Sequence, residues 1–296
     1  MELVSLDSMQ VYRGMDVGTA SPTAAERTAV RHHLVDVADP WEPWSVARTQ
    51  AGVTTALAEI EARGHRAVLV GGTGLYVRSV VDGFTLPGED LERRAELEAE
   101  AATEDGVTRL RAELEAVDPV AAARIEPANV RRLVRALEVV RSTGRPFSEA
   151  GDGLDVYGPP RLDVTLVGVW LPRAELARRI ERRVAAMVDA GFEDEVRLLL
   201  AAERPLSRTA AEAIGYREVA AALRGERTMA DALAETVART RRFARRQRVW
   251  FRRDPRITWV AAAADPGALL GAVRSRWGAM PTVAATRPPA VAPATV

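Results

Sequence analysis

The stretch MELVSLDSMQ (residues 1–10) decides the fold class, because an apolar run passes directly into a polar loop. Glu2–Leu6 has the composition of a β-strand, and Asp7, Ser8, Met9 and Gln10 follow it at once. Open α/β sheets bind their ligands in loops at the carboxyl ends of their strands. The stretch therefore predicts a strand of a parallel sheet with a candidate site at its end, although no strand or helix precedes it.

A second strand-and-loop unit follows about 60 residues later. A helix is predicted from Ser45, a good N-cap, to Gly64, a typical helix stop. The apolar run RAVLV (66–70) then predicts a buried strand that ends in the glycine-rich GGTGLY (71–76), and a further helix is expected over 75–82. Strands that alternate with helices in this way are typical of a parallel sheet with crossover helices.

The pattern changes after residue 85 and returns after residue 150. Helix follows helix up to Phe147, and DVTLVGVWL (163–171) then predicts another buried strand. Further helices are expected at 173–190, 193–201, 209–223, 229–252 and 266–277, with a short strand at 256–260. We interpret 1–84 as the first part of an α/β core, 85–150 as a helical insertion, 151–278 as the second part of the core, and 279–296 as a disordered tail rich in Pro, Ala and Thr.

Composition limits the classes of function. The 296 residues contain no cysteine, which excludes disulfides and thiolate metal sites. We find no apolar run of membrane-spanning length and no signal peptide, so we expect a monomer in the cytoplasm with no membrane partner.

The charge is balanced overall but unevenly placed. All 41 basic residues are arginine, and the segment 239–256 contains nine of them against one acid, Asp254. A basic face on a neutral protein is compatible with a phosphate-rich partner. Charge alone nevertheless favours solvated helix faces in the protein of a GC-rich genome.

Two loops carry candidate chemistry. A carboxylate at a strand end, such as Asp7, can accept a proton or a hydrogen bond from a substrate amine, although an Asx-turn accounts for the residue as well. Gly71, Gly72 and Gly74 permit a phosphate or nucleotide to approach a helix N-terminus, but a tight turn explains them equally. His32 and His33 lack the spaced partners of a metal site, so no metal ligand is predicted.

The insertion contains a basic helix, PANVRRLVRALEVV (127–140), whose arginines fall close together on the helix. Such a face can bind an RNA backbone. A solvated face paired with Glu138 is the alternative.

Taken together and in order, six stretches resemble the tRNA dimethylallyltransferase family, also called tRNA isopentenyltransferases. They are SLDSMQVYRGMDVGTASPT (5–23), HHLVDVADPWEPWSV (32–46), VLVGGTGLYVRSVVDG (68–83), DPVAAARIEPANVRRLVRALEV (118–139), AIGYREV (213–219) and TRRFARRQRVWFRR (240–253). The match spans nearly the whole chain before the tail.

The resemblance implies transfer of a dimethylallyl group from dimethylallyl diphosphate to N6 of the adenosine 3′-adjacent to the anticodon in tRNA. It implies a P-loop-kinase-like parallel-sheet core, an insertion that binds the anticodon stem-loop, and Mg²⁺. Asp7 would be the general base or hydrogen-bond acceptor for the N6 amine. Residues that match the family's tRNA-binding positions are Asp7, Ser8, Met9, Gln10, Thr73, Arg94, Arg131, Arg132, Leu133, Val134 and Arg135.

The sequence departs from the family in three places. Asn129 stands where Asp is usual, and Val249 where Thr is usual. The third departure is the family's first strand and P-loop, which holds the diphosphate and supplies a Mg²⁺ ligand. That element is absent here, and a chain without lysine lacks its Gly-Lys-Ser/Thr ending.

We interpret Met1 as an internal methionine taken for the start, at the second strand of the core, and we assign no diphosphate-binding residue. As written, the chain is expected to be inactive or impaired in transfer, with exposed sheet edges. One alternative is a non-catalytic tRNA-binding remnant. A weaker one is an adenylate isopentenyltransferase, which the arginine face of the insertion disfavours.

Overall fold

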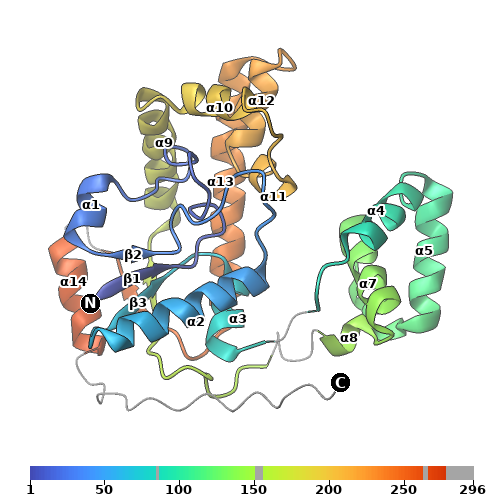
Figure 1. Cartoon of the computed structure of the whole chain (residues 1–296), viewed down its shortest axis with the longest axis horizontal. Helices are drawn as coiled ribbons and strands as arrows, with labels where there is room; N and C mark the ends of the chain where they lie inside the picture. Colours follow the sequence, from blue (N-terminus) through green and yellow to red (C-terminus); the bar gives the residue numbers. More distant parts are fainter. Residues whose placement is uncertain (85–86, 151–155, 263–265, 278–296) are drawn as a thin grey trace.

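The computed structural model describes residues 1–84, 87–150, 156–262 and 266–277. Its first part is a three-stranded sheet of β1 (Glu2–Ser5), β2 (His32–His33) and β3 (Ala67–Val70), in the order β2-β1-β3. All pairs are parallel, with Glu2 opposite Ala67 and Ser5 opposite Val70. The predicted parallel α/β fold is confirmed (Figure 1).

The helices of this part are α1 (Ala24–Ala29), α2 (Val46–Ala62) and α3 (Gly74–Asp82). Ser45 caps α2 as predicted, since its hydroxyl accepts a hydrogen bond from the Arg48 N–H. Helix α2 buries Val53, Ala56 and Ile60 in the apolar cluster that also contains Val4 of β1. This packing fixes β1, and therefore the loop that follows it, to the helix layer.

The second part contains β4 (Val167–Trp170) and β5 (Thr258–Ala261), a separate parallel pair. Its helices are α9 (Arg173–Asp189), α10 (Phe192–Leu200), α11 (Arg208–Ala211), α12 (Tyr216–Leu223), α13 (Met229–Phe251) and α14 (Pro266–Trp277). The single helix expected over 209–223 is wrong. Gly215, at φ 97°, separates α11 from α12, because that backbone conformation cannot continue a helix.

The largest apolar cluster joins the loop after β1 to the helices of the second part. Val11, Tyr12 and Met15 of that loop pack with Phe192 and Tyr216, whose rings meet edge to face with centroids 5.1 Å apart. A loop that contributes this much buried surface has a fixed conformation.

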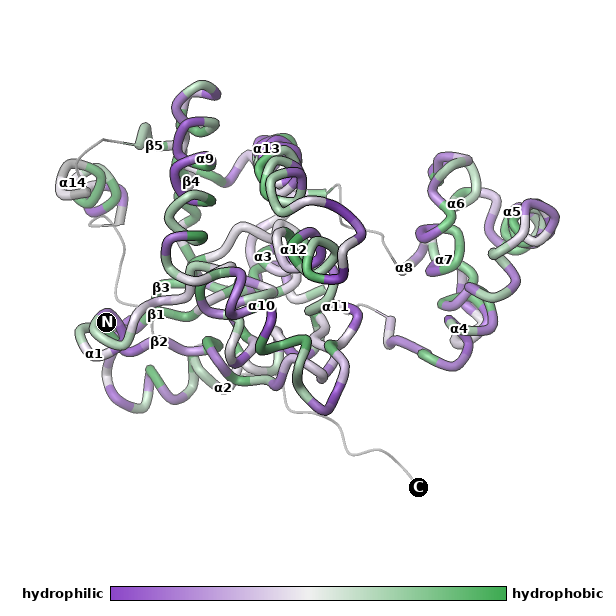
Figure 2. The backbone as a smooth tube through the Cα atoms, turned by 90° about the horizontal axis from the view of Figure 1, so that it is seen from above, coloured by the Kyte–Doolittle hydropathy of each residue, from purple (hydrophilic) through white to green (hydrophobic). Residues whose placement is uncertain are grey.

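Five helices form a group that stands apart from the core in Figures 1 and 2. They are α4 (Leu91–Glu100), α5 (Glu104–Val117), α6 (Pro119–Arg124), α7 (Val130–Thr143) and α8 (Phe147–Ala150). We call residues 87–150 the helical lobe. Its own apolar cluster includes Leu97, Leu110 and Leu133, each 0% exposed.

Two edge strands, β3 and β4, carry exposed apolar side chains. Among the described residues, β3 pairs only with β1, and β4 pairs only with β5. Val70 of β3 is 53% exposed and Val169 of β4 is 48% exposed, which is unusual for apolar residues of parallel strands. The short β2 and α1 were not predicted, and the tail 279–296 lies outside the described residues. No helix in the described part of the chain is long and apolar enough to cross a bilayer.

Candidate functional site

The Asp7 loop and the glycine-rich loop meet at the carboxyl edge of the first sheet. The Leu6 N–H donates to the Val70 carbonyl at 2.7 Å, so the two loops leave the sheet side by side. A Cβ on Gly71 would lie 2.6 Å from Leu6 Cβ, so only glycine permits this approach. The structure therefore brings together two regions that the sequence singled out separately.

Asp7 uses one carboxylate oxygen to shape its own loop. Its Oδ1 accepts hydrogen bonds from the N–H groups of Met9, at 2.8 Å, and Gln10, at 3.4 Å. Within the part of the chain that the structure describes, Oδ2 has no partner, and no arginine pairs with Asp7. The Asx-type turn is thus present, and it leaves an oxygen available to a substrate.

Gln10 braces the loop from within. The Ser5 hydroxyl donates to Gln10 Oε1 at 3.0 Å, and Gln10 Nε2 donates to the Ala20 carbonyl at 3.2 Å. Met9 packs against the large apolar cluster, while the Ser8 hydroxyl has no partner among the described residues. Of the four predicted loop residues, Asp7 and Ser8 therefore offer free polar atoms.

Glu195 of α10 anchors the continuation of this loop. Its carboxylate accepts hydrogen bonds from the N–H groups of Asp16, Val17 and Gly18 at 2.7–3.1 Å, and from the Tyr216 hydroxyl at 2.6 Å. Burial, together with the Glu195 charge, raises the pKa of Tyr216, so its hydroxyl keeps the proton that it donates. Sequence reasoning missed Glu195, because three consecutive acids at 193–195 give no indication of which one turns inward.

The glycine-rich loop packs against α13. A Cβ on Gly72 would lie 2.3 Å from Gln247 Nε2, and one on Gly74 would lie 2.1 Å from the Trp250 ring. Gln247 Nε2 also donates to the Gly72 carbonyl at 2.9 Å. Close packing thus accounts for these glycines without a phosphate ligand.

Polar atoms at this contact remain without partners. Thr73 is the N-cap of α3, yet its hydroxyl makes no capping hydrogen bond. Arg248 Nε and Trp250 Nε1 are buried donors with no acceptor among the described residues. The Arg248 guanidinium stacks on Trp170 of β4, 5.2 Å from the ring centroid. The site therefore combines a free carboxylate oxygen with unfilled donors on the neighbouring elements.

Tyr76 lies under the same edge and is 8% exposed. Burial, with added effects of Tyr12, Glu89 and Asp7, raises the pKa of Tyr76 to about 12. Its phenol therefore remains neutral at physiological pH and adds no charge beside Asp7.

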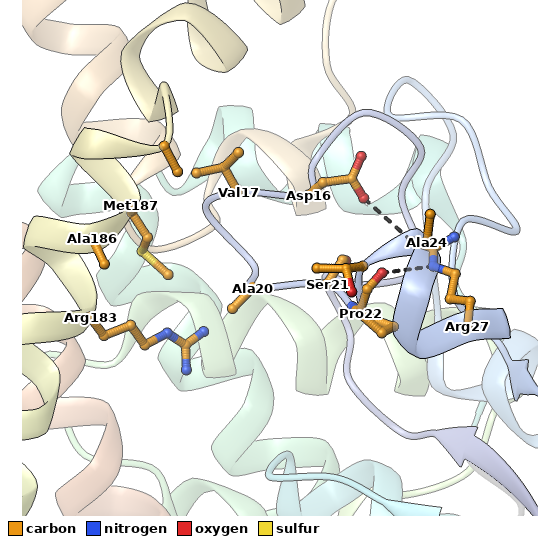
Figure 3. Close-up of a pocket in the computed structure, with 12 residues that line it drawn as sticks. Asp16, Val17, Ala20, Ser21, Pro22, Ala24, Arg27, Arg183, Ala186 and Met187 are labelled. Atoms are coloured by element: carbon orange, nitrogen blue, oxygen red, sulfur yellow. Dashed lines mark hydrogen bonds and ion pairs between the residues drawn. The ribbon is translucent and has the colours of Figure 1, made fainter. Parts of the chain in front are cut away.

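A cavity of about 570 Å³ lies between the loop 16–27 and α9 (Figure 3). Asp16 and Arg27 line one side, and Arg183 and Met187 of α9 line the other. Arg183 Nη2 donates to the Thr19 carbonyl at 3.2 Å and forms no ion pair with the described residues. Burial, reinforced by Asp36 and Glu195, raises the pKa of Asp16. The cavity thus combines an apolar wall with an arginine whose charge is not neutralised.

The predicted tRNA-binding residues of the helical lobe divide into two groups. Arg94 and Arg135 both form ion pairs with Glu138, which is 0% exposed. Arg94 Nε donates to Glu138 at 2.8 Å and Arg135 Nη1 at 2.5 Å, and the Asp90 N–H donates to the same carboxylate at 2.9 Å. This arrangement is a structural ion pair network of the kind that the sequence left open as an alternative.

Leu133 and Val134 face the interior of the lobe, where they are 0% and 3% exposed. Arg131 and Arg132 are exposed, and their guanidinium groups form no ion pair with the described residues. Asn129 caps α7 by accepting a hydrogen bond from the Arg132 N–H at 3.1 Å. An Asp at this position would cap the helix in the same way. The free cations of α7 are therefore at its N-terminal end.

Among the described residues, three of the six arginines of α13 form ion pairs, whereas Arg245, Arg246 and Arg248 form none. Arg241 pairs with Glu181 and Arg242 with Glu235 at the surface, whereas Arg239 reaches the buried Glu218. Val249, in place of the usual threonine, is 53% exposed. Two of these pairs join α13 to other helices, and the pair of Arg242 with Glu235 lies within α13.

No group of three or more His, Asp and Glu in the described part of the chain is arranged to hold a metal ion. The described residues therefore do not form a complete Mg²⁺ site by themselves.

Comparison with known proteins gives a consistent result. Residues 10–254 match the family model described as IPP transferase. The tRNA dimethylallyltransferase of Nocardioides sp. is 50% identical over 90% of this chain and 84% of its own length, and that of Streptomyces avermitilis is 50% identical over 89% and 83%.

Solved structures agree with this assignment. The tRNA isopentenylpyrophosphate transferase of Bacillus halodurans has a TM-score of 0.67 and 38% identity, with 94% of this chain and 87% of that chain covered. A eukaryotic dimethylallyltransferase acting on tRNA shares the fold at a TM-score of 0.69 and 24% identity, with 92% and 71% covered. The chain belongs to the IPP transferase family.

Proposed function

We propose that the site described above serves dimethylallyl transfer to tRNA, with dimethylallyl diphosphate as donor and N6 of the adenosine 3′-adjacent to the anticodon as acceptor. The observation that carries the proposal is Asp7 Oδ2 at the carboxyl edge of the sheet, to which no described residue donates a hydrogen bond or pairs a cation. A carboxylate that is not neutralised can accept a hydrogen bond and then a proton from an amine.

The chemistry needs two kinds of group. The adenine N6 amine is a weak nucleophile until a carboxylate positions it and accepts its proton, which is the role proposed for Asp7. The base must also leave its stack to reach that loop. As the allylic C–O bond breaks, negative charge develops on the leaving diphosphate and must be met by cations and N–H donors.

Two sets of described groups fit the second requirement. Arg183 lines the cavity between the loop 16–27 and α9 and forms no ion pair with the described residues. Arg248 Nε and Trp250 Nε1 are donors without acceptors beside the glycine-rich loop. We propose these groups as candidates for contacts to the prenyl donor, with Thr73 beside the nucleotide.

The helical lobe is proposed to bind the anticodon stem-loop. Arg131 and Arg132 would contact phosphates directly, because no acid of the described residues pairs with them. Arg94 would act by holding α4 to α7 through Glu138, Arg135 by joining α7 to the carbonyls of Pro87 and Gly88, and Leu133 and Val134 by forming the core beneath that surface. A monomer in the cytoplasm and a requirement for Mg²⁺ complete the proposal.

A direct assay tests the transfer. The printed sequence contains no Gly-x-x-x-x-Gly-Lys-Ser/Thr loop, so we expect the 296-residue chain to transfer a labelled dimethylallyl group to a tRNA transcript slowly or not at all. A chimera that adds the strand and P-loop of a relative before Met1 should be faster by orders of magnitude. Robust turnover by the 296-residue chain would show that its own residues hold the diphosphate.

Arg131 and Arg132, which form no ion pair with the described residues, also fit a second candidate, a tRNA-binding protein that does not transfer the prenyl group. It predicts stem-loop binding by the 296-residue chain and no activity in the chimera. An adenylate isopentenyltransferase, the weaker alternative, predicts transfer to free AMP, which is measured in the same assay.

A further inference from the structure

A cluster of two arginines and two aspartates lies at the base of the helical lobe. Arg78 and Asp82 belong to α3, and Asp254 and Arg256 lie in the loop between α13 and β5. We call these four residues the root cluster. Arg78 Nε donates to Asp82, while Arg256 donates to Asp82 from Nη1 at 2.5 Å and to Asp254 from Nη2 at 2.7 Å.

The root cluster binds both segments that connect the lobe to the core. On the return segment, Arg78 Nη2 donates to the Val156 carbonyl at 2.8 Å, and Arg256 Nη1 donates to the Gly158 carbonyl at 3.0 Å. The Tyr157 ring lies against both arginines, 4.2 Å and 5.7 Å from their guanidinium carbons.

On the outgoing segment, the Phe84 ring lies 4.9 Å from the Arg78 guanidinium carbon. The Gln50 side chain of α2 donates to the Phe84 carbonyl at 2.8 Å and fixes this segment to the core. One buried arginine therefore contacts the chain where it leaves the core and where it returns.

A second polar link between lobe and core, also within the described residues, is weak by comparison. Arg208 of α11 pairs with Glu98 of α4 at 2.5 Å, but their side chains are 59% and 41% exposed. Exposed pairs contribute little to stability. In the root cluster, Arg78 is 3% exposed and Asp254 is 6% exposed, so each charge depends on its partners.

We propose that the root cluster sets the position of the helical lobe relative to the core, so that the Asp7 loop and Arg131–Arg132 are held at the spacing of one RNA stem-loop. This inference rests on the proposed function. The four residues are positioning residues, because none of them contacts the Asp7 loop. If the lobe sampled many positions, RNA affinity would fall by the fraction of time spent in the competent one.

The first experiment measures lobe position without RNA. Because the chain lacks cysteine, Ala112→Cys on α5 and Ala185→Cys on α9 provide unique sites for spin labels on exposed residues. Double electron–electron resonance should give one narrow distribution of the distance between the two labels in the parent. Arg256→Gln should broaden it by about half or more, because the lobe then populates several positions.

Two further variants keep this test decisive. Tyr157→Leu removes the ring contacts without leaving a buried charge, so it reports even if Arg256→Gln does not fold, and it should broaden the distribution as well. Arg197→Gln, which breaks an exposed pair within α10, is the matched control and should leave the distribution unchanged. A narrow, unshifted distribution in every folded variant of the root cluster overturns the proposal.

The second experiment measures affinity for an anticodon stem-loop RNA and for a short single-stranded loop RNA. Arg256→Gln and Tyr157→Leu should weaken stem-loop binding about three- to tenfold and leave loop binding unchanged, since only the stem-loop reaches both parts. A broadened distance with unchanged stem-loop affinity overturns the role in RNA binding. If the parent binds no stem-loop, the proposed function fails, while the distance result still decides whether the cluster positions the lobe.

Discussion

Asp7 in the α/β core and Glu138 in the helical lobe are carboxylates with opposite surroundings. Glu138 is 0% exposed and accepts hydrogen bonds from Arg94, Arg135 and a backbone N–H. Asp7 is partly exposed and, as far as the described residues go, has no arginine partner and keeps one oxygen free. A neutralised, buried carboxylate holds helices together, whereas one without cations remains available to a substrate. The same chemical group thus serves stability in one region and is proposed for catalysis in the other.

The largest expected effect concerns Asp7, the carboxylate proposed for catalysis. In the chimera with the added strand and P-loop, Asp7→Asn should lower prenyl transfer about 10²- to 10⁴-fold, because the amide cannot accept the N6 proton. The assay follows labelled dimethylallyl transfer to tRNA, with Asp189→Asn at the exposed end of α9 as control. Near-normal turnover of Asp7→Asn would remove Asp7 from this role.

The next largest expected effect concerns Glu138, the carboxylate that stabilises the helical lobe. Glu138→Ala should destabilise the helical lobe by about 3–5 kcal/mol, since it leaves two partly buried arginines without their shared partner. Denaturant unfolding followed by circular dichroism measures the change. Glu113→Ala, which removes the more exposed partner of Arg141, should cost less than about 1 kcal/mol. Equal losses in the two variants would contradict the special role of Glu138.

A smaller effect on RNA binding distinguishes the unpaired arginines of α7 from those that form ion pairs with described residues. Arg131→Ala and Arg132→Ala should each weaken stem-loop RNA binding several-fold and reduce the salt dependence by about one counterion. Arg141→Ala, whose guanidinium already pairs with Glu113, is the control and should have a weaker effect. Titrations at several salt concentrations provide the measurement, and an equal salt slope for all three variants would count against the interface.

The smallest effect sharpens the comparison with a third carboxylate, Glu2 of β1. Hydrogen bonds from Arg63, His33 and His65 hold the pKa of Glu2 well below its ordinary value of 4.5. Its contribution to stability is therefore complete above that ordinary value and is lost as the pH falls below it. Urea midpoints measured from about pH 6 to about pH 3 should fall less steeply in Glu2→Gln than in the parent. Parallel curves would show that Glu2 does not carry this dependence.

Much of the fold was predictable from local patterns. The strand at 2–6, the strand at 66–70 and the helix at 229–252 lie within about one residue of their observed ends, because apolar runs, caps and breakers act locally. The break at Gly215 was missed, since a glycine within a helical pattern does not reveal its φ angle. The two-residue β2 was missed, because its pairing with β1 is a long-range contact.

The candidate site was predictable in its residues but not in their partners. The sequence by itself determined the family resemblance, the alternation of strands and helices, and the residue types available for chemistry. Only the tertiary structure decided that Arg94 and Arg135 are bound to Glu138 while Arg131 and Arg132 are free, and that Glu195 holds the loop after Asp7. The physical reason is that a motif fixes the chemistry of a side chain, whereas its availability depends on charges and packing contributed by residues distant in the sequence.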